Sequence, residues 1–512
     1  MGVRPDVGAG LYCSPLFAVL GKNDIKHHRG MRSSDRRSSR VLTATRRSRG
    51  VAALLLGRRA DWRLERFPSL SAPRPGRHWV GPLVVTTSVL VGWFAFDGAV
   101  GDGNVAFALF LGSASIVMMA WSLVLALRLR VNETLFGGLD RAYRWHRWLG
   151  ALSVPAMWLH IETVDDVEGI PGASRDIAHA AEDLAEQAET IIYVLVAASL
   201  LRWLPTRWWR WTHKAIGVPF AFASWHFYTA TKPYANDSAW GIWFAVLMSA
   251  GLLAWLVRVV VRDAFSGERC TVVNVERSES ITTVDLRPLK GVGRRAAPGQ
   301  FAFVRFNAPG LREPHPFTLA SSPTADLLRF HIRDLGDWTN HLGRSVTPGM
   351  VARVEGPYGR LSPLSPPGRR ALWVAGGVGI TPFLSALDQA DPACPPVLLY
   401  TFRTADDAAG LGALERARTA GLIDLHLFET AAGDRLCAEY LDAVFPDGLC
   451  DAHVVMCGPT ALMADMRHGV RQRGQRVCHI EGFDIRTGVG PDLSVPVDTA
   501  LSQLRSRLAK AD

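Results

Sequence analysis

The chain has few cysteines for its length, and none of them forms a CxxC pair. Seven cysteines are spread over 512 residues, and none lies between residues 79 and 256, where many of the 17 tryptophans are found. Zinc sites, iron–sulfur clusters and disulfide frameworks are built from closely spaced or numerous cysteines. The sequence therefore argues against all three, and it fits thiols that stay reduced in a cytoplasm.

Acidic residues are scarce in residues 1–78, which carry 17 Lys or Arg against 5 Asp or Glu. This segment has a charge of +12, and the rest of the chain is near neutral at −2. Runs such as RSSDRRSSR predict a disordered basic cytoplasmic tail. Attraction to anionic lipid is its favoured role, and a nucleic-acid-binding arm without a folded motif is the alternative. Residues 51–57 are too short a run for a signal peptide, and Met31 is a second candidate for the first residue.

Apolar runs much longer than one membrane crossing are lacking, but six runs of moderate length lie between residues 79 and 262. They cover about 80–96, 105–127, 146–164, 189–204, 212–230 and 239–261. A helix needs about 20 apolar residues to cross a bilayer, and tryptophan suits the interfaces of the bilayer. Hydrophobic residues make up 48% of the chain, with a mean hydropathy of +0.10. We therefore expect a six-helix transmembrane bundle over residues 79–262.

The charges between these runs predict their orientation. Five arginines lie in 128–147 and four basic residues in 202–214, whereas the opposite loops hold only Arg175 and Lys232. Because basic residues favour the cytoplasmic side, we expect a multi-pass protein of the plasma membrane with both termini in the cytoplasm. The segment 161–189 is acidic, and we interpret it as a solvated outer loop or a short surface helix.

Two of the apolar stretches begin and end with histidine. HRWLGALSVPAMWLH spans 146–160 and HKAIGVPFAFASWH spans 213–226. A fourteen-residue step covers about 21 Å of helix and returns to nearly the same face, so His146 and His160 share a face. The thirteen-residue step does not, so alignment of His213 with His226 requires a helix distortion near Pro219.

Four histidines at two matched depths on two parallel helices indicate a function, because polar groups inside a membrane are costly. Two stacked bis-histidine haems account for all four. His146 and His213 would bind the cytoplasmic haem iron, and His160 and His226 the outer one. For any single histidine, a hydrogen bond across helices is the alternative interpretation.

After Arg262 the apolar runs become short and are interrupted by Gly and Pro. CTVVNVE, FAFVRF and LLRFHIR predict an antiparallel β-barrel over residues 268–365. Residues 366–486 alternate apolar strands, such as ALWVAGG and AHVVMCG, with helical stretches, which is typical of a parallel α/β domain. Residues 487–512 are a C-terminal extension of unknown role.

Together these features resemble the ferric reductase and NADPH oxidase family, in which a haem-bearing transmembrane domain is fused to a ferredoxin-reductase-type module. HPFTLASSP at 315–323, HIRDLGDWT at 331–339 and EGPYG at 355–359 resemble the family's flavin-domain motifs. By this resemblance Arg333 contacts the FAD diphosphate, since a guanidinium fork suits phosphate oxygens. The implied FAD-binding residues are His315, Pro316, Phe317, Thr318, His331, Arg333, Gly336, Trp338, Thr339, Gly356 and Tyr358.

WVAGGVGITPF at 373–383 reads as a strand, a glycine turn and a helix start, which suits a nucleotide phosphate. CGPTALM at 457–463 resembles the segment that holds a cysteine near the nicotinamide, and EGFDIR resembles the segment with an aromatic residue over the flavin. The implied residues are Gly376, Gly377, Gly379, Thr381, Pro382, Arg403, Cys457, Gly458 and Pro459, with Cys457 and Phe483 at the reacting rings.

Arg403 follows a predicted strand at a position where an arginine pairs with a 2′-phosphate, so NADPH is favoured over NADH. Asp406 and Asp407, which we expect to cap a helix N-terminus, weaken this preference.

The resemblance implies a transmembrane oxidoreductase that passes electrons from cytoplasmic NAD(P)H through FAD and two b-type haems to a small acceptor on the outer face. Oxygen, reduced to superoxide, is the favoured acceptor, and a ferric chelate is the alternative. A third interpretation is a haem-bearing membrane sensor with an inactive reductase half. NAD(P)H consumption separates the third from the others. The lipid bilayer is the expected partner, and nucleic acid is not.

Overall fold

The computed structural model describes residues 78–97, 102–164, 169–200, 206–262, 266–289 and 296–481. The chain divides into two compact units, Met1–Leu70 and Ser71–Asp512, and every described residue belongs to the second. The predicted basic tail up to residue 77, Phe483 and the C-terminal extension lie outside the described residues.

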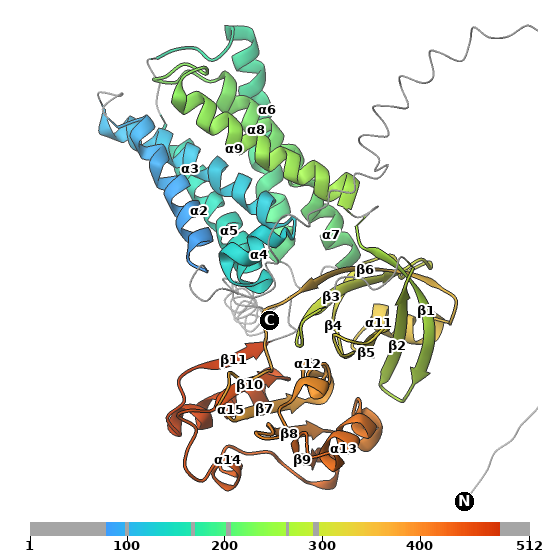
Figure 1. Ribbon diagram of the computed structural model, residues 1–512. Helices are drawn as coiled ribbons and strands as arrows, with labels where there is room; N and C mark the ends of the chain where they lie inside the picture. Colours follow the sequence, from blue (N-terminus) through green and yellow to red (C-terminus); the bar gives the residue numbers. More distant parts are fainter. Residues whose placement is uncertain are drawn as a thin grey trace, which may run out of the picture. The chain divides into compact units, whose positions relative to one another are not determined.

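The first part of the described chain is helical (Figure 1). Its elements are α2 (Val80–Leu90), η2 (Val91–Ala95), α3 (Gly103–Leu125), α4 (Arg130–Phe136), α5 (Leu139–Thr163), α6 (Arg175–Leu200), α7 (Thr206–Ala215), α8 (Gly217–Thr229), α9 (Ala239–Leu256) and the π-helical η3 (Val257–Arg262). Each predicted apolar run overlaps one or two of them. Among the described residues, two helices are long and apolar enough to cross a membrane, Gly103–Leu125 and Ala239–Val260, and Val80–Ala95 is a shorter apolar helix.

The acidic segment before residue 189 is part of a long helix, which corrects the expected loop or short surface helix. Helix α6 has 26 residues and includes five of the acidic residues of this segment. Its buried residues Ala181, Ala188, Ile192 and Leu195 recur at helical spacing. One apolar face is enough to fix an amphipathic helix, because the acidic side chains stay on the opposite face.

The helix that carries His213 and His226 is interrupted at Ile216, between α7 and α8. This is the distortion that the thirteen-residue spacing required. Pro219 has no N–H to donate to the residue four positions earlier, so the backbone opens one turn before it. At the break, the Trp255 indole of α9 donates a hydrogen bond of 2.7 Å to the carbonyl oxygen of Lys214. A Cβ on Gly217 would lie only 2.1 Å from the Trp255 ring, so glycine is needed there.

The second part begins with an antiparallel, barrel-like sheet. Its strands are β1 (Glu268–Arg277), β2 (Ile281–Pro288), β3 (Phe301–Phe306), β4 (His315–Thr318), β5 (Leu328–Arg333) and β6 (Val351–Tyr358), in the order β4-β3-β6-β1-β2-β5, and α11 (Asp337–Ser345) follows β5. The two ends of the sheet meet where the Ala320 N–H donates to the carbonyl oxygen of Arg329 at 2.9 Å. Phe306 and Phe330 are fully buried in the core. The barrel prediction is confirmed.

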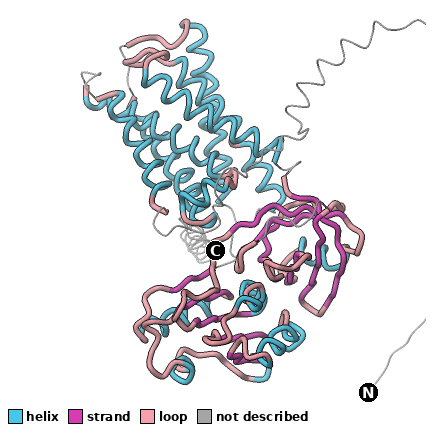
Figure 2. Tube along the Cα trace, viewed as in Figure 1, coloured by secondary structure: helices cyan, strands magenta, loops and turns pink. Residues whose placement is uncertain are grey.

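The third part is a parallel α/β domain, as predicted (Figure 2). Its strands are β7 (Ala371–Gly376), β8 (Val397–Phe402), β9 (Asp424–Glu429), β10 (His453–Cys457) and β11 (Cys478–Glu481), with α12 (Thr381–Leu384), α13 (Leu411–Thr419), α14 (Tyr440–Val444) and α15 (Thr460–Gln472), and with the 3-10 helices η4 (Gly377–Ile380), η5 (Leu387–Gln389), η6 (Ala405–Asp407) and η7 (Thr430–Ala432). All six residues of β7 are buried, as expected for a strand covered on both faces. The strand order is β11-β10-β7-β8-β9, so the chain reverses direction across the sheet between β7 and β10.

Candidate functional site

Two histidines on α5 are oriented by backbone carbonyls of α3. His146 Nδ1 lies 2.8 Å from the carbonyl oxygen of Ser122, and His160 Nδ1 lies 2.8 Å from that of Ala108. A carbonyl only accepts hydrogen bonds, so each Nδ1 carries the proton and each Nε2 keeps a free lone pair. Metal-binding histidines are usually fixed in this way, and both rings are therefore prepared as ligands.

The two carbonyls follow the same spacing as the two histidines. Ala108 and Ser122 are fourteen residues apart, as are His146 and His160. The earlier carbonyl of α3 meets the later histidine of α5, so the two helices are antiparallel and equal steps keep both pairs in register. Sequence reasoning missed these partners because a backbone carbonyl has no side-chain signature. The available signal is Gly112, where a Cβ would lie 2.9 Å from the His160 ring.

The other predicted ligands lie on α7 and α8. His213 Nδ1 is 3.2 Å from the hydroxyl oxygen of Ser199, and its ring stacks on Trp209 with 5.2 Å between centroids. The His146 and His213 ring centroids are 5.8 Å apart with planes at 83°. Metal–imidazole bonds are about 2 Å long, so two axial nitrogens on one iron are about 4 Å apart, which agrees with this centroid distance. These residues therefore fit a bis-histidine haem.

The outer pair has equivalent positions on its helices. His160 is in the last turn of α5, and His226 is in the last turn of α8. Each is thus one helix span away from the histidine that begins its stretch. The four rings fit two haem positions at two depths of the helical part.

The predicted flavin motif HPFT forms strand β4, which pairs with β3. Trp338 in the first turn of α11 stacks on His315 at 4.0 Å and on Phe317 at 5.9 Å between ring centroids. Pro316 pairs with Phe303 of β3 in the ladder. The structure therefore brings together residues of the two predicted flavin motifs.

Two polar atoms in this cluster are buried and have no hydrogen-bond partner among the described residues. They are Thr318 Oγ1 and Trp338 Nε1. Leaving a buried donor or acceptor unpaired costs about 1–3 kcal/mol, so a polar ligand is expected here. The flavin ring and ribityl chain of FAD carry both donors and acceptors, and these residues fit that group.

Arg333, at the end of β5, reaches the glycine turn that follows β7. A Cβ on Gly377 would lie 3.1 Å from Arg333 Nη1, and Gly377 has a φ of 54°. Thr339 has a different contact, because its Oγ1 accepts hydrogen bonds from the N–H groups of Leu335 and Gly336 at 2.9 and 3.1 Å. The predicted residues Gly336 and Thr339 thus shape the turn before α11.

His331 and His315 are kept neutral. His331 Nδ1 and the Thr283 hydroxyl are 2.8 Å apart, a hydrogen bond within the barrel. Burial, assisted by the charge of Arg329, lowers the pKa of His331 to about 4. Burial, assisted by Arg210, lowers the pKa of His315 to about 4. Both imidazoles are therefore uncharged near neutral pH.

The two nucleotide motifs meet where the strand order reverses. A Cβ on Gly379 would lie 2.3 Å from the carbonyl oxygen of Cys457, and one on Gly376 would lie 2.6 Å from Pro459 Cδ. A Cβ on Gly458 would lie 2.9 Å from the Gly376 nitrogen. Only glycine permits these approaches. In open parallel sheets, ligands bind outside the carboxyl ends of the strands at such a point, so these residues fit a nucleotide.

Thr381 and Pro382 begin α12, beside this crevice, and both are buried. The Thr381 hydroxyl donates to the carbonyl oxygen of Val378 at 3.0 Å, which stabilises the preceding turn. Cys457 is fully buried at the end of β10. Phe483, the second predicted residue at the reacting rings, lies outside the described residues.

Arg403 follows β8 and is exposed. The capping expected of Asp406 and Asp407 is wrong, because Thr404 is the N-cap of η6 and makes no side-chain cap bond. Asp407 instead accepts a hydrogen bond from the Ser280 hydroxyl, at the end of the hairpin that links β1 and β2.

The corner between α3 and α5 contacts the barrel, a feature that sequence reasoning missed. Arg128 Nε donates to the Tyr143 hydroxyl at 2.8 Å, and its guanidinium lies 3.6 Å from the centroid of the Phe303 ring. Glu133 Oε1 accepts a hydrogen bond of 2.6 Å from the Gly359 N–H. Burial raises the pKa of the Glu133 carboxyl.

Two predicted flavin residues lie at this contact. Tyr358 is buried with Leu139 and Phe303, and its hydroxyl donates to Glu355 Oε1 at 2.8 Å. The Gly356 carbonyl oxygen accepts from Arg130 at 3.4 Å. The EGPYG motif thus joins the barrel to the helical part.

Comparison with known proteins matches residues 270–362 to the model of the FAD-binding domain family. The chain is 35% identical over 113 residues to NADPH oxidase 1 of Mus musculus, which covers 21% of this chain and 18% of that protein. It is 30% identical over 107 residues to the superoxide-generating NADPH oxidase heavy chain of Dictyostelium discoideum, with 18% and 21% covered. The match thus spans about a fifth of the length of these relatives.

Among solved structures, the chain is similar to the ferredoxin reductase in carbazole 1,9a-dioxygenase. The TM-score is 0.38 with 20% identity over 43% of this chain and 69% of that one. It is also similar to the cytochrome b5 reductase domain of Ulva prolifera nitrate reductase, with a TM-score of 0.37 and 16% identity over 42% and 97% of the two chains.

Proposed function

As a member of the NADPH oxidase and ferric reductase family by its reductase half, this chain is, we propose, an NAD(P)H-driven flavocytochrome that reduces an acceptor across a membrane. When bound, FAD takes up two electrons and releases them singly, and haem iron carries one electron at a time. The observation that carries the proposal is the matched spacing of two histidines and two carbonyls, which prepares ligands at two depths. A structural core without redox centres does not need this arrangement.

The chain's own residues bind, orient and exclude water. Gly376, Gly379 and Gly458 let the backbones of two strand ends approach closely, which leaves a crevice for the nucleotide and its phosphates. Trp338 and Thr318 contribute an aromatic face and a hydroxyl for the flavin. The buried Cys457 lies at the end of the strand beside the glycine turn, where it would contact the nicotinamide.

In the helical part, Ser122 and Ala108 hold the proton of each α5 histidine on Nδ1 and keep Nε2 as the ligand atom. Trp209 and Ser199 restrain His213 from the other side. Electrons pass first near His146 and His213 and then near His160 and His226. With both axial positions occupied by imidazole, the acceptor reacts at the haem edge.

Oxygen is the proposed acceptor, in keeping with the superoxide-generating relative. Each NAD(P)H supplies two electrons, so two oxygen molecules become two superoxide ions and one proton is released in the cytoplasm. A ferric chelate is the second candidate, since exposed acidic residues on the first half of α6, Asp176, Asp183 and Glu186, favour cationic species.

The test is NADPH oxidation by the purified, FAD- and haem-loaded chain, with oxygen or with ferric citrate under argon. We expect oxygen-dependent turnover and cytochrome c reduction that superoxide dismutase abolishes. Turnover with ferric citrate alone would transfer the proposal to the metalloreductase. Intact cofactors with no NADPH consumption would refute both and favour the sensor.

A flavin-binding test uses Thr318→Ala combined with Arg333→Ala. Loss of the hydroxyl and of the guanidinium should release FAD, because both hydrogen bonding and phosphate charge are lost. Dithionite should still reduce the haems. Stoichiometric FAD in the double variant would contradict the assigned flavin site.

A further inference from the structure

A pocket of about 580 Å³ lies between the start of α2 and the first turns of α5. The basic side chains His78, Arg141 and Arg144 line it together with the indoles of Trp79, Trp145 and Trp148. It is separate from the histidine pairs, the flavin cluster and the nucleotide crevice. None of the activity proposed above uses these residues.

Two glycines make this pocket possible by close backbone approach. A Cβ on Gly81 of α2 would lie 2.5 Å from the Phe136 ring and 2.9 Å from the Leu135 carbonyl oxygen. A Cβ on Gly137, which has a φ of 79°, would lie 2.5 Å from His78 Cβ. The start of α2 is therefore fixed against the turn between α4 and α5, and the pocket is a formed feature of the fold.

The charge in the pocket is positive. Arg141 makes no hydrogen bond or ion pair with another described residue. Arg144 pairs with Asp140 at 3.1 Å, but the Asp140 side chain is 73% exposed, and an exposed pair of this kind is weak. Two guanidinium groups one turn apart on α5 can therefore meet an anion, and their forked donors suit phosphate oxygens.

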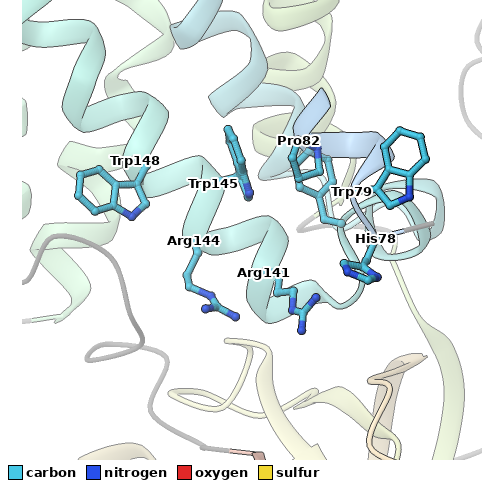
Figure 3. Close-up of a pocket in the computed structure, with 8 residues that line it drawn as sticks. His78, Trp79, Pro82, Arg141, Arg144, Trp145 and Trp148 are labelled. Carbon is cyan, nitrogen blue, oxygen red and sulfur yellow. The ribbon is translucent and has the colours of Figure 1, made fainter. Parts of the chain in front are cut away.

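The polar and apolar sides of the pocket are segregated. Figure 3 shows the guanidinium groups of Arg141 and Arg144 on the same side as His78, with Trp145 and Trp148 farther along α5. Trp148 is 45% exposed and Trp79 is 56% exposed. Indoles of this kind lie at the headgroup level of membranes, next to the acyl chains. A phosphate with apolar chains attached matches both sides, whereas a free phosphate ion uses only the basic side.

We propose that this pocket binds the headgroup phosphate of an anionic phospholipid of the cytoplasmic leaflet. The proposal rests on the membrane-spanning part of the proposed function. The bound lipid braces the first turns of α5, where Trp145 precedes His146 and packs on Phe136 at 6.1 Å between ring centroids. The site thus connects the lipid composition to the element that carries two of the histidines.

The experiment measures the binding of short-chain dihexanoyl-phosphatidylglycerol, dihexanoyl-phosphatidylcholine and inorganic phosphate to the full chain in a neutral detergent. We expect phosphatidylglycerol to bind at least tenfold more tightly than either other probe. Arg141→Ala with Arg144→Ala should weaken that binding about thirtyfold, since a basic residue at an anionic surface contributes about one factor of five. Arg141→Lys with Arg144→Lys should recover most of the binding.

A matched control removes Arg416 and Arg418 of α13, which are also exposed arginines with one weak ion pair between them and Glu415. This control should bind phosphatidylglycerol like the unmodified chain. Equal losses in both double variants, or equal affinity for phosphate and lipid, would overturn the site. Haem content and NADPH turnover are measured on the same samples. Normal values without lipid preference refute the lipid site alone, and absent haem refutes the proposed function alone.

Discussion

The helical half and the reductase half present their functional groups on different kinds of backbone. In the helical half, side chains in mid-helix are the functional groups, and carbonyls of a neighbouring helix orient them, as Ser122 and Ala108 do. In the reductase half, the backbone itself is the functional group, at glycine turns where strands end. Helices satisfy their own backbone, so they offer side chains, whereas strand ends leave N–H groups free for phosphates.

This difference teaches which substitutions harm each half. Removal of a side chain should disable a position in the helical half, and addition of a single carbon should disable a position in the reductase half. Each half should then fail without the other.

The largest effect is expected from loss of a histidine ligand. His160→Ala or His226→Ala should each remove one of two haems, because no neighbouring group replaces the lost imidazole. FAD content and NADPH-driven reduction of a soluble dye should stay unchanged. Pyridine haemochrome assays give the haem count, and two haems per chain in both variants would contradict the ligand assignment.

The matching change in the reductase half is Gly379→Ala. The new Cβ would lie 2.3 Å from the Cys457 carbonyl oxygen, so two strand ends must separate. We expect NADPH oxidation to fall about a hundredfold, as for displacements of about 1 Å at reacting groups, with full haem content. Gly412→Ala in α13, where the nearest atom is a flexible arginine terminus at 3.5 Å, is the control and should be nearly silent.

The contact between the halves is tested at Glu133. Glu133→Ala removes the acceptor of the Gly359 N–H bond and leaves that donor unpaired, which costs about 1–3 kcal/mol. Haem reduction by NADPH should slow about tenfold while dye reduction persists. Glu133→Gln keeps an acceptor oxygen and should behave like the parent chain. Stopped-flow absorbance of the haems decides this, and identical rates in the alanine variant would show that the contact is not needed.

Acid should affect the barrel through His315 and His331. Their pKa values are lowered to about 4, below the ordinary value near 6.5, so folding keeps both imidazoles unprotonated. The stability they provide is therefore complete above about pH 6.5 and is lost as the pH falls toward 4. We expect FAD release at a melting temperature several degrees lower at pH 5 than at pH 7.5. His315→Gln with His331→Gln should flatten this dependence in flavin-fluorescence melting curves, and an unchanged slope would contradict it.

The smallest effect is expected at Arg403, an exposed residue. Arg403→Ala should raise the KM for NADPH a few-fold and leave the KM for NADH unchanged, because the guanidinium pairs only with the 2′-phosphate. Steady-state kinetics with both donors measure this. A parent chain that prefers NADH, or equal weakening for both donors, would show that Arg403 does not recognise the phosphate.

The sequence by itself determined the class of each part and the identity of most of the candidate site residues. The fourteen-residue histidine spacing, the short β runs and the ordered flavin and nucleotide motifs all depend on side-chain identity and on local periodicity. These signals survive without knowledge of the tertiary structure. The break near Pro219 was predicted for the same reason, because a missing N–H is a local property.

Only the tertiary structure decided which groups meet. The carbonyls of Ala108 and Ser122, the approach of Gly379 to Cys457 and the contact of Glu133 with Gly359 involve backbone atoms that every residue type shares. The acidic segment became helical because four residues of α6 bury one face against neighbouring helices, a gain that local charge does not reveal. Long-range packing selects these contacts, and the sequence records them only as glycines where a side chain would not fit.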